Sequence, residues 1–187
     1  MRIILTGPPG AGKGTQAQSL SSKLQLPHIS TGDLFRSHIA EGTDLGRRAK
    51  TFLDAGELVP DEVTIGMVVE RLAADDATAG FILDGFPRTV AQAVALDEFL
   101  AEQLIQINAV LDFSIADDAV VGRMLARGRA DDTEDVIRRR LRVYHDETRP
   151  LLDYYSALLV SVDADGEVDE IYARAIGALS ERVASTP

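Results

Sequence analysis

The sequence contains no cysteine, which excludes a disulfide framework and any metal site built from thiolates. It also lacks a long apolar run, since the stretch 3–5 is far too short for a signal peptide or a membrane span. A chain of 187 residues is long enough for one domain with one core. Because the lack of cysteine fits a reducing compartment, we expect a cytoplasmic protein.

Positive charge is scarce as well, since the formal net charge is −11. Nucleic acids and anionic membranes attract proteins with an excess of positive charge, so we expect neither as a partner. Of the two side chains that are always counted as positive, lysine is the rarer, with 3 residues against 16 arginines. We expect most of the arginines on solvated helix surfaces. A few are candidates for one anion-binding cleft, because a guanidinium binds phosphate through a rigid two-pronged fork.

Short apolar segments alternate with amphipathic ones along the chain. The segments expected as strands are 2–6, 28–30, 80–83, 109–113 and 159–162. Those expected as helices are 13–25, 33–41, 44–55, 61–74, 89–104, 117–126, 133–156 and a last one from about 167. Strands separated by helices pair in parallel through right-handed crossovers. The pattern therefore predicts a three-layer α/β fold with a five-stranded parallel sheet, interrupted by three helices in 31–74 and by the charged loop ARGRADD at 126–132.

The first expected strand runs into GPPGAGK, residues 7–13, where a helix is expected to begin. Glycines let several backbone N–H groups converge on one point, and the N-terminus of the following helix is aimed at the same point. Lys13 adds a positive charge for the terminal phosphates of a nucleoside triphosphate. The pattern predicts a phosphate-binding loop, whereas its glycine spacing does not match a dinucleotide-binding turn.

Two further motifs follow this loop, STGDLFR at 30–36 and LDGFPRT at 83–89. Within the loop, Gly14 follows Lys13 where most such loops carry the Ser or Thr that binds Mg²⁺, and Thr15 comes one place later. By these three motifs, over essentially its whole length, the chain resembles the adenylate kinases, which interconvert ATP plus AMP with two ADP. The resemblance implies a P-loop fold, a monomer, and Mg²⁺ bound together with ATP.

The resemblance also implies a role for each matching residue. For ATP it implies contacts from Gly10, Ala11, Gly12, Lys13, Gly14, Thr15, Arg127 and Gly166. For AMP it implies contacts from Thr31, Arg36, Glu57, Leu58, Val59, Gly85, Phe86, Pro87, Arg88, Gln92, Arg129 and Arg140. It implies catalytic roles for Lys13, Arg88, Arg123, Arg127, Arg129 and Arg140. Arg123 and Gly166 are implied near the ATP base and the backbone of 57–59 at the adenine of AMP, while Arg138 and Arg139 are expected to point to solvent. Asp84 is implied as a Mg²⁺ ligand through water, with Thr15 as a further candidate, and the Phe86–Pro87 bond is expected to be cis.

Two mobile segments are implied as well, a helical flap over AMP at about 30–59 and a short lid at 126–132. Many relatives have a longer lid with a four-cysteine zinc site. The lid of this chain has only seven residues and no cysteine. We therefore expect no zinc, while the phosphate-binding arginines of the lid remain.

Some of these residues have a structural interpretation too. Ser30 and Thr89 have the spacing of helix N-caps, and Gln92, three residues after Thr89, is a candidate capping-box partner. Asp84 can also be interpreted as a carboxylate that caps a turn. No Ser–His–Asp, Cys–His or paired-carboxylate pattern accompanies the motifs. We therefore expect His28, His38 and His145 to be structural or exposed.

Two other functions stay open. One is a UMP/CMP-type nucleoside monophosphate kinase, although such relatives tend to carry Ala where this chain has Thr31. The other is a nucleotide-dependent switch without turnover. A switch would have no use for a second phosphate clamp such as Arg36 with Arg88, or for the arginines of the lid.

Overall fold

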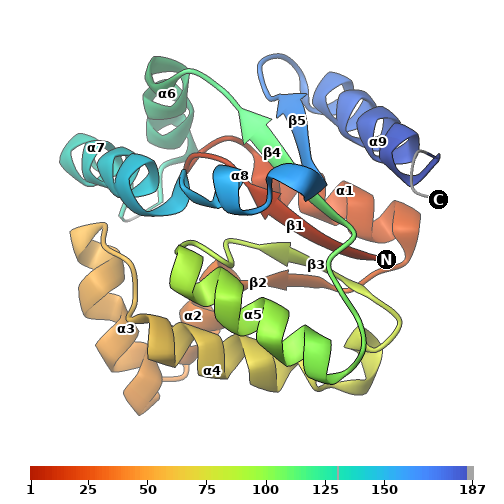
Figure 1. The fold of residues 1–187 in the computed structure, drawn as a ribbon. Coiled ribbons are helices and arrows are strands. Elements are labelled where there is room, and N and C mark those ends of the chain that lie inside the picture. The colour runs from red at the N-terminus through yellow and green to blue at the C-terminus, as the bar shows by residue number, and fades with distance from the viewer. Residues whose placement is uncertain (130, 185–187) are drawn as a thin grey trace.

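The computed structural model describes residues 1–129 and 131–184. Within them, five parallel strands form one sheet in the order β2-β3-β1-β4-β5. The strands are β1 (Arg2–Thr6), β2 (His28–Ser30), β3 (Phe81–Asp84), β4 (Ala109–Ser114) and β5 (Leu159–Asp163). Helices cover both faces of the sheet (Figure 1). The predicted three-layer α/β fold with a five-stranded parallel sheet is confirmed.

The helices follow the predicted order. They are α1 (Lys13–Leu24), α2 (Thr31–Ala40), α3 (Asp44–Ala55), α4 (Asp61–Leu72), α5 (Val90–Glu102), α6 (Asp117–Arg127), α7 (Glu134–Val143), α8 (Leu151–Tyr154) and α9 (Val168–Ala184). Short turns of other helix types are η1 (Asp75–Ala77), η2 (Tyr144–Thr148) and η3 (Ser156–Leu158). α2 begins at Thr31, two residues earlier than expected, because the Ser30 side chain accepts a hydrogen bond from the Asp33 N–H and caps it.

The single helix expected over 133–156 is wrong. α7 ends at Val143 and continues as the π-helical turn η2, in which Arg149 N donates to the carbonyl of Tyr144, before the short α8 begins. The reason is Pro150, which has no N–H to continue a regular helix and whose ring clashes with the preceding turn. Amphipathic spacing continues across this break, so the pattern alone does not reveal it.

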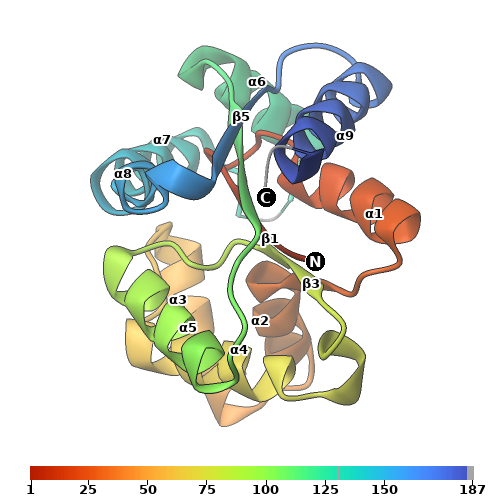
Figure 2. The ribbon, with the colours of Figure 1, turned by 45° about the vertical axis from the view of Figure 1, so that its right-hand side comes forward.

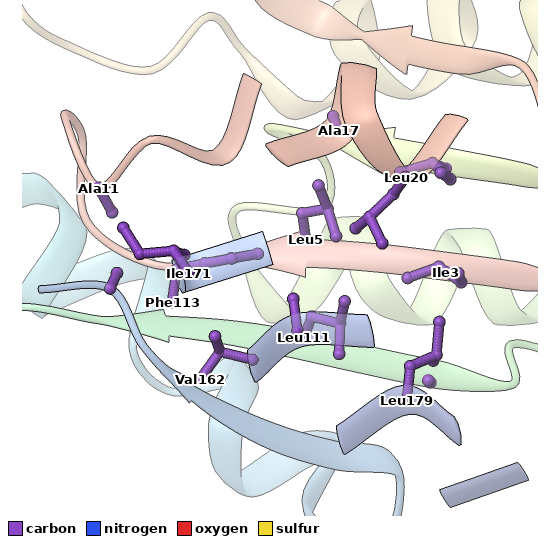
Figure 3. Packing of buried hydrophobic residues seen from close by; sticks show 14 of the residues in the cluster. Ile3, Leu5, Ala11, Ala17, Leu20, Leu111, Phe113, Val162, Ile171 and Leu179 are labelled. Carbon is purple, nitrogen blue, oxygen red and sulfur yellow. The ribbon is translucent and has the colours of Figure 1, made fainter. Parts of the chain in front are cut away.

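The core lies on both faces of the sheet. On one face, side chains from α1 and α9 such as Leu20, Ile171 and Leu179 pack on Leu5 and Leu111 of the central strands (Figure 3). The other face is covered by α4, α5 and α8. Figure 2 shows α1 and α9 together on one side of the sheet. No helix in the described part of the chain is both long and apolar enough to cross a bilayer.

Strand register brings the motifs to one edge of the sheet. Leu5 and Ser30 both stand opposite Asp84, and Thr6 stands opposite Asp112. The glycine loop, the start of α2 and the turn after β3 therefore leave the sheet side by side. β1 lies at the centre of the sheet, with β3 and β2 on one side and β4 and β5 on the other. The strand order therefore reverses its direction at β1. In open parallel sheets the crevice for ligands opens at this place, outside the carboxyl ends of the strands.

Candidate nucleotide site

The glycine loop, residues 7–13, connects β1 to α1. Gly7 has a φ of 131°, and a Cβ atom there would lie 2.5 Å from the carbonyl oxygen of Phe113. Any side chain at this position would collide with backbone, so the tight turn requires glycine. Lys13 Nζ donates to the carbonyls of Gly7 and Pro8, each at 2.7 Å. The ammonium is thus held inside the loop, at the N-terminus of α1.

Lys13 carries the most perturbed ammonium of the site. Burial lowers its pKa from 10.5 to about 8, an effect that the nearby carboxylates of Asp84 and Asp112 only partly offset. The positive charges of Arg88 and Arg127 act on it in the same direction as burial. A cation so poorly solvated gains more than a surface lysine from a bound phosphate.

Asp84 ends β3 beside Lys13. Its Oδ2 atom lies 3.4 Å from His28 Nε2, and the side chains are only 13% and 15% exposed. Burial would raise the pKa of Asp84, but the hydrogen bond from His28 and the charge of Lys13 outweigh it and hold that pKa below its ordinary value. Asp84 therefore stays a carboxylate. His28, expected to be structural or exposed, lies at the site instead, because β2 pairs with β3 in this register.

The turn after β3 positions Arg88. The Phe86–Pro87 bond is cis, as predicted. Arg88 Nε and Thr31 Oγ1 both donate to the carbonyl of Gly85, each at 2.8 Å. Gly85 has a φ of 78°, and a Cβ atom there would lie 2.9 Å from both side chains. The structure thus brings together three of the residues expected at AMP, and glycine is required between the other two.

Gln92 is fully buried at the start of α5. Its backbone N–H donates to Thr89 Oγ1 at 3.2 Å, so Thr89 caps the helix as predicted. Gln92 Oε1 does not close a capping box on Thr89, since it accepts from the N–H of Arg88 at 2.7 Å. Its Nε2 donates to Asp61, a residue that the motifs did not single out.

A hollow of about 340 Å³ opens beside these groups. We call it the base hollow. It is lined by Glu57, Leu58, Val59, Pro60, Asp61, Thr89, Val143 and Glu147. The three backbone positions expected at the adenine of AMP thus line one cavity with Asp61.

The lid arginines are paired with aspartates. Arg127 donates two hydrogen bonds to Asp132, at 2.9 and 2.8 Å, and the Asp132 side chain is fully buried. The backbone N–H of Arg129 also donates to Asp132, and Arg140 pairs with both Asp131 and Asp132. Two aspartates that the motifs did not mark thus join three of the expected arginines. Ala130, within the expected lid, lies outside the described residues.

Arginine charges converge around the site. Burial lowers the pKa of Arg88, and the positive charges of Arg140 and Arg36 lower it further while Asp84 opposes them. Burial likewise lowers the pKa of Arg129, with the charges of Arg127 and Arg36 adding to it. Arg36 pairs with Asp33 at 2.5 Å and stays half-exposed. This concentration of positive charge in an acidic protein suits the binding of anions.

Arg123, on α6, contacts the turn that follows β5. Arg123 Nη1 donates to the carbonyl of Ala164 at 2.9 Å, and its Nη2 reaches the carbonyl of Gly166 at 3.5 Å. Arg123 and Gly166, both expected near the ATP base, are therefore neighbours. Thr15 is exposed on the first turn of α1. Arg138 and Arg139, expected to point to solvent, are about half-exposed and pair with Glu134 and Glu57.

The end of α3 and the turn that follows it contact α7. Arg140 Nη2 donates to the carbonyl of Leu53 at 3.2 Å, and Arg139 pairs with Glu57. α3 and α7 accordingly lie on the same side of the molecule (Figure 1). Residues 53–57 and 139–140, which are far apart in the sequence, are therefore in contact.

The carboxylates of the cleft suit a magnesium ion. Within the described residues no cluster of three or more His, Asp or Glu could hold a metal alone. Mg²⁺, however, keeps several waters and takes one or two carboxylates together with substrate phosphates. Asp84 and Asp112 flank the loop, and Asp112 Oδ1 is buried without a hydrogen-bond partner in the described structure. These hard oxygen donors fit Mg²⁺ brought in with a nucleotide.

Comparisons with known proteins agree with this geometry. A sequence model described as adenylate kinase matches residues 5–159. The adenylate kinase of Mycolicibacterium vanbaalenii is 62% identical over 179 residues, which cover 96% of this chain and 99% of the relative. That of Corynebacterium diphtheriae is 58% identical over 181 residues, or 97% and 100% of the two chains. That of Rhodococcus erythropolis is 61% identical over 181 residues, with the same coverage.

Proposed function

The chain belongs to the adenylate kinase family, and from this premise we propose how its cleft holds the two nucleotides. As a member, it is a nucleoside monophosphate kinase that transfers a phosphoryl group reversibly from ATP to AMP, giving two ADP. The observation that carries the proposal is that Lys13 and Arg88 both act on Asp84, while Arg127 adds its positive charge near Lys13 and Arg36 and Arg140 add theirs near Arg88. A site for one nucleotide needs one set of cationic side chains for its phosphates. A site for two nucleotides needs two sets, one for each.

ATP lies on the side of the glycine loop. The backbone N–H groups of residues 10–15 and the ammonium of Lys13 face its phosphates, since helix N-termini and such loops attract anions. Arg127 lies over the phosphates, and Arg123 with the Gly166 turn borders the base. The Arg123 contacts to Ala164 and Gly166 support this placement.

AMP lies on the side of α2 to α5. Arg88 and Arg36 bind its phosphate, and Arg129 and Arg140 reach the group being transferred. The base enters the base hollow, where the backbone of 57–59, the amide of Gln92 and Thr31 read its edge, with Gly85, Phe86 and Pro87 close to AMP. Residues 30–59 form the flap over AMP, and residues 126–132 form the short lid over the phosphates.

The reaction needs no general base. An AMP phosphate oxygen is already anionic near neutral pH, because the second pKa of a phosphate monoester is about 6. This oxygen attacks the terminal phosphorus of ATP in line, and the bond to the bridging oxygen of ADP breaks. Lys13 and the arginines hold the two phosphates in line and neutralise the charge. Asp84 would hold Mg²⁺ through water, and the ion would supply further neutralisation of charge. Closure of flap and lid excludes water, which would otherwise hydrolyse ATP.

The depressed pKa of Lys13 predicts a pH profile. In the free enzyme the ammonium loses its proton as pH rises through about 8, so kcat/KM for ATP should fall above that pH. Bound triphosphate retains the proton, so kcat at saturating ATP should hold to higher pH. Direct quantification of ADP by chromatography at constant Mg²⁺ checks both curves. A kcat/KM for ATP that stays flat from pH 7 to 9.5 would show that Lys13 does not titrate there.

The base contact predicts a selective effect of Gln92→Ala. KM for AMP should rise about tenfold, because a lost buried hydrogen bond leaves its partner unpaired, while KM for ATP should hardly change. Initial rates with ATP and each of AMP, CMP and UMP test this together with the substrate preference. Equal rises in both KM values would reduce Gln92 to a structural residue. A wild-type enzyme faster with UMP or CMP would favour the pyrimidine alternative.

We further propose that the protein acts as a monomer in the cytoplasm. Among the described residues, the exposed large apolar side chains Leu104, Leu125, Tyr154 and Val168 lie apart in the sequence, and only Val90 and Val94 lie one helical turn apart, on α5. Scattered exposed apolar residues of this kind are normal for monomers. Sedimentation equilibrium of the purified protein would show a mass near 20.2 kDa if the monomer is correct.

A further inference from the structure

Asp61 opens α4 and faces the start of α5. Its Oδ1 accepts from Gln92 Nε2 at 2.6 Å, and its Oδ2 accepts from Thr89 Oγ1 at 2.9 Å. A carboxylate accepts hydrogen bonds and donates none, so the amide of Gln92 must turn its NH₂ group toward Asp61. On its other side, Gln92 Oε1 accepts from the N–H of Arg88, a group that only donates. Because Asp61 only accepts and the N–H of Arg88 only donates, these two partners fix the orientation of the Gln92 amide.

The fixed amide has one N–H and one oxygen lone pair left, since each of its ends uses one position inside the protein. Adenine offers an acceptor at N1 and a donor at its 6-amino group. Hypoxanthine and guanine offer the reverse, a donor at N1 and an acceptor at O6. A freely turning amide could match either base by exchanging its two ends. An amide held in one orientation matches adenine and opposes the other two.

We propose that Asp61 is a positioning residue that makes this kinase select AMP over 6-oxopurine monophosphates by fixing the amide of Gln92. The proposal rests on the proposed role of Gln92 at the base of AMP. Asp61 lines the base hollow beside 57–59, so the network lies where the base enters. Discrimination arises because a reversed base would place donor against donor and acceptor against acceptor, which leaves buried groups unpaired.

Asp61→Asn tests the proposal with little change in shape. Asparagine offers both a donor and an acceptor, so it permits either orientation of the Gln92 amide, while the Arg88 N–H still favours the original one. IMP is the substrate to compare with AMP, because it differs only in the donor and acceptor reversed at positions 1 and 6. The ratio of kcat/KM for AMP to that for IMP should fall about tenfold, the scale of a hydrogen bond to a charged group. The change should appear mainly in KM, with KM for ATP unchanged.

Thr89→Ala is the matched control. It removes the other hydrogen bond of Asp61 and the cap of α5, so it should lower Tm, but it leaves the carboxylate facing Gln92. The AMP/IMP ratio should stay that of the wild type. If Thr89→Ala lowers this ratio as much as Asp61→Asn does, Asp61 only joins α4 to α5 and the proposal is wrong.

A double-mutant cycle separates the remaining cases. In a Gln92→Ala background, Asp61→Asn should lower the AMP/IMP ratio no further, because Asp61 acts through the amide. An additive loss would mean that Asp61 contacts the base itself, which overturns the positioning role. If Gln92→Ala alone leaves KM for AMP unchanged, the proposed function of Gln92 fails first. If Gln92→Ala raises it while Asp61→Asn keeps the wild-type ratio, only the inference about Asp61 fails.

A measurement without turnover completes the test. The side-chain NH₂ of Gln92 can be assigned in a ¹⁵N–¹H correlation spectrum by its loss in Gln92→Ala. In the free wild type, its hydrogen bond to a carboxylate should shift one proton and slow its exchange with solvent. Asp61→Asn should speed that exchange, whereas Thr89→Ala should not. Equal exchange in the wild type and Asp61→Asn contradicts the fixed amide.

Discussion

Lys13→Ala should fold normally and lose phosphoryl transfer by about 10³-fold or more, the scale on which phosphate-clamping charges act. The ammonium lies inside the glycine loop, where the Gly7 and Pro8 carbonyls hold it at 2.7 Å. In a buried site a positive charge facing phosphates acts at low dielectric and needs no reorganisation during the reaction. Chromatographic quantification of ADP at saturating ATP and AMP measures the loss.

Stability distinguishes this loss from misfolding. Burial disfavours the charged form of Lys13 and lowers its pKa, so the folded state is stabilised little by that charge. Tm of Lys13→Ala should therefore equal or exceed that of the wild type. Lys50→Ala, which removes an exposed lysine paired with Asp54, is the matched control and should keep wild-type rates. A folded Lys13→Ala enzyme with near wild-type turnover would remove the glycine loop from the mechanism.

Arg88→Ala should reduce kcat/KM for AMP by about 10³-fold while it leaves KM for ATP nearly unchanged, because arginines that clamp a reacting phosphate act on this scale. The guanidinium is oriented by its Nε hydrogen bond to the carbonyl of Gly85. The charges of Arg36 and Arg140 repel it, so binding of an anion between them is favoured. Initial rates with AMP varied at saturating ATP, and the reverse, separate the two constants.

Two comparison variants sharpen this result. Arg88→Lys keeps the charge but loses the two-pronged fork, so its activity should lie between those of the wild type and Arg88→Ala. Arg71→Ala removes an arginine outside the site, one that donates two hydrogen bonds to Asp76 at the surface, and should leave both kinetic constants unchanged. Full activity of Arg88→Lys would show that charge alone matters, and an equal rise of both KM values in Arg88→Ala would place Arg88 outside the AMP side.

The tight glycine turn and the two helix caps could be predicted from the sequence because each depends on local backbone demands. The glycine loop needs residues without side chains, and Gly7 beside Phe113 shows the reason. The caps at Ser30 and Thr89 were predicted because an N-cap depends on neighbours two or three residues away. The helix predicted over 133–156 was wrong, since spacing alone does not register the missing N–H of Pro150.

Two of the residues that the motifs missed have partners far away in the sequence, and two have partners nearby. Asp61 meets Gln92 across 31 positions, and His28 meets Asp84 across 56. Asp131 and Asp132 stand beside the predicted arginines, yet only the burial of Asp132 distinguishes it from a solvated charge. Nothing local marks such partners, because each becomes one only after two elements have packed together.

The sequence by itself determined the elements, the glycine loop and the chemical kind of the site, since periodicity, capping and backbone freedom are properties of neighbouring residues. Tertiary structure decided which carboxylate faces which cation. Strand register placed Ser30 and Leu5 opposite Asp84 and Thr6 opposite Asp112. Packing of α4 on α5 turned the Gln92 amide toward Asp61. The reason is that charge pairing and desolvation depend on distances of a few ångströms, which only the assembled sheet and its helices fix.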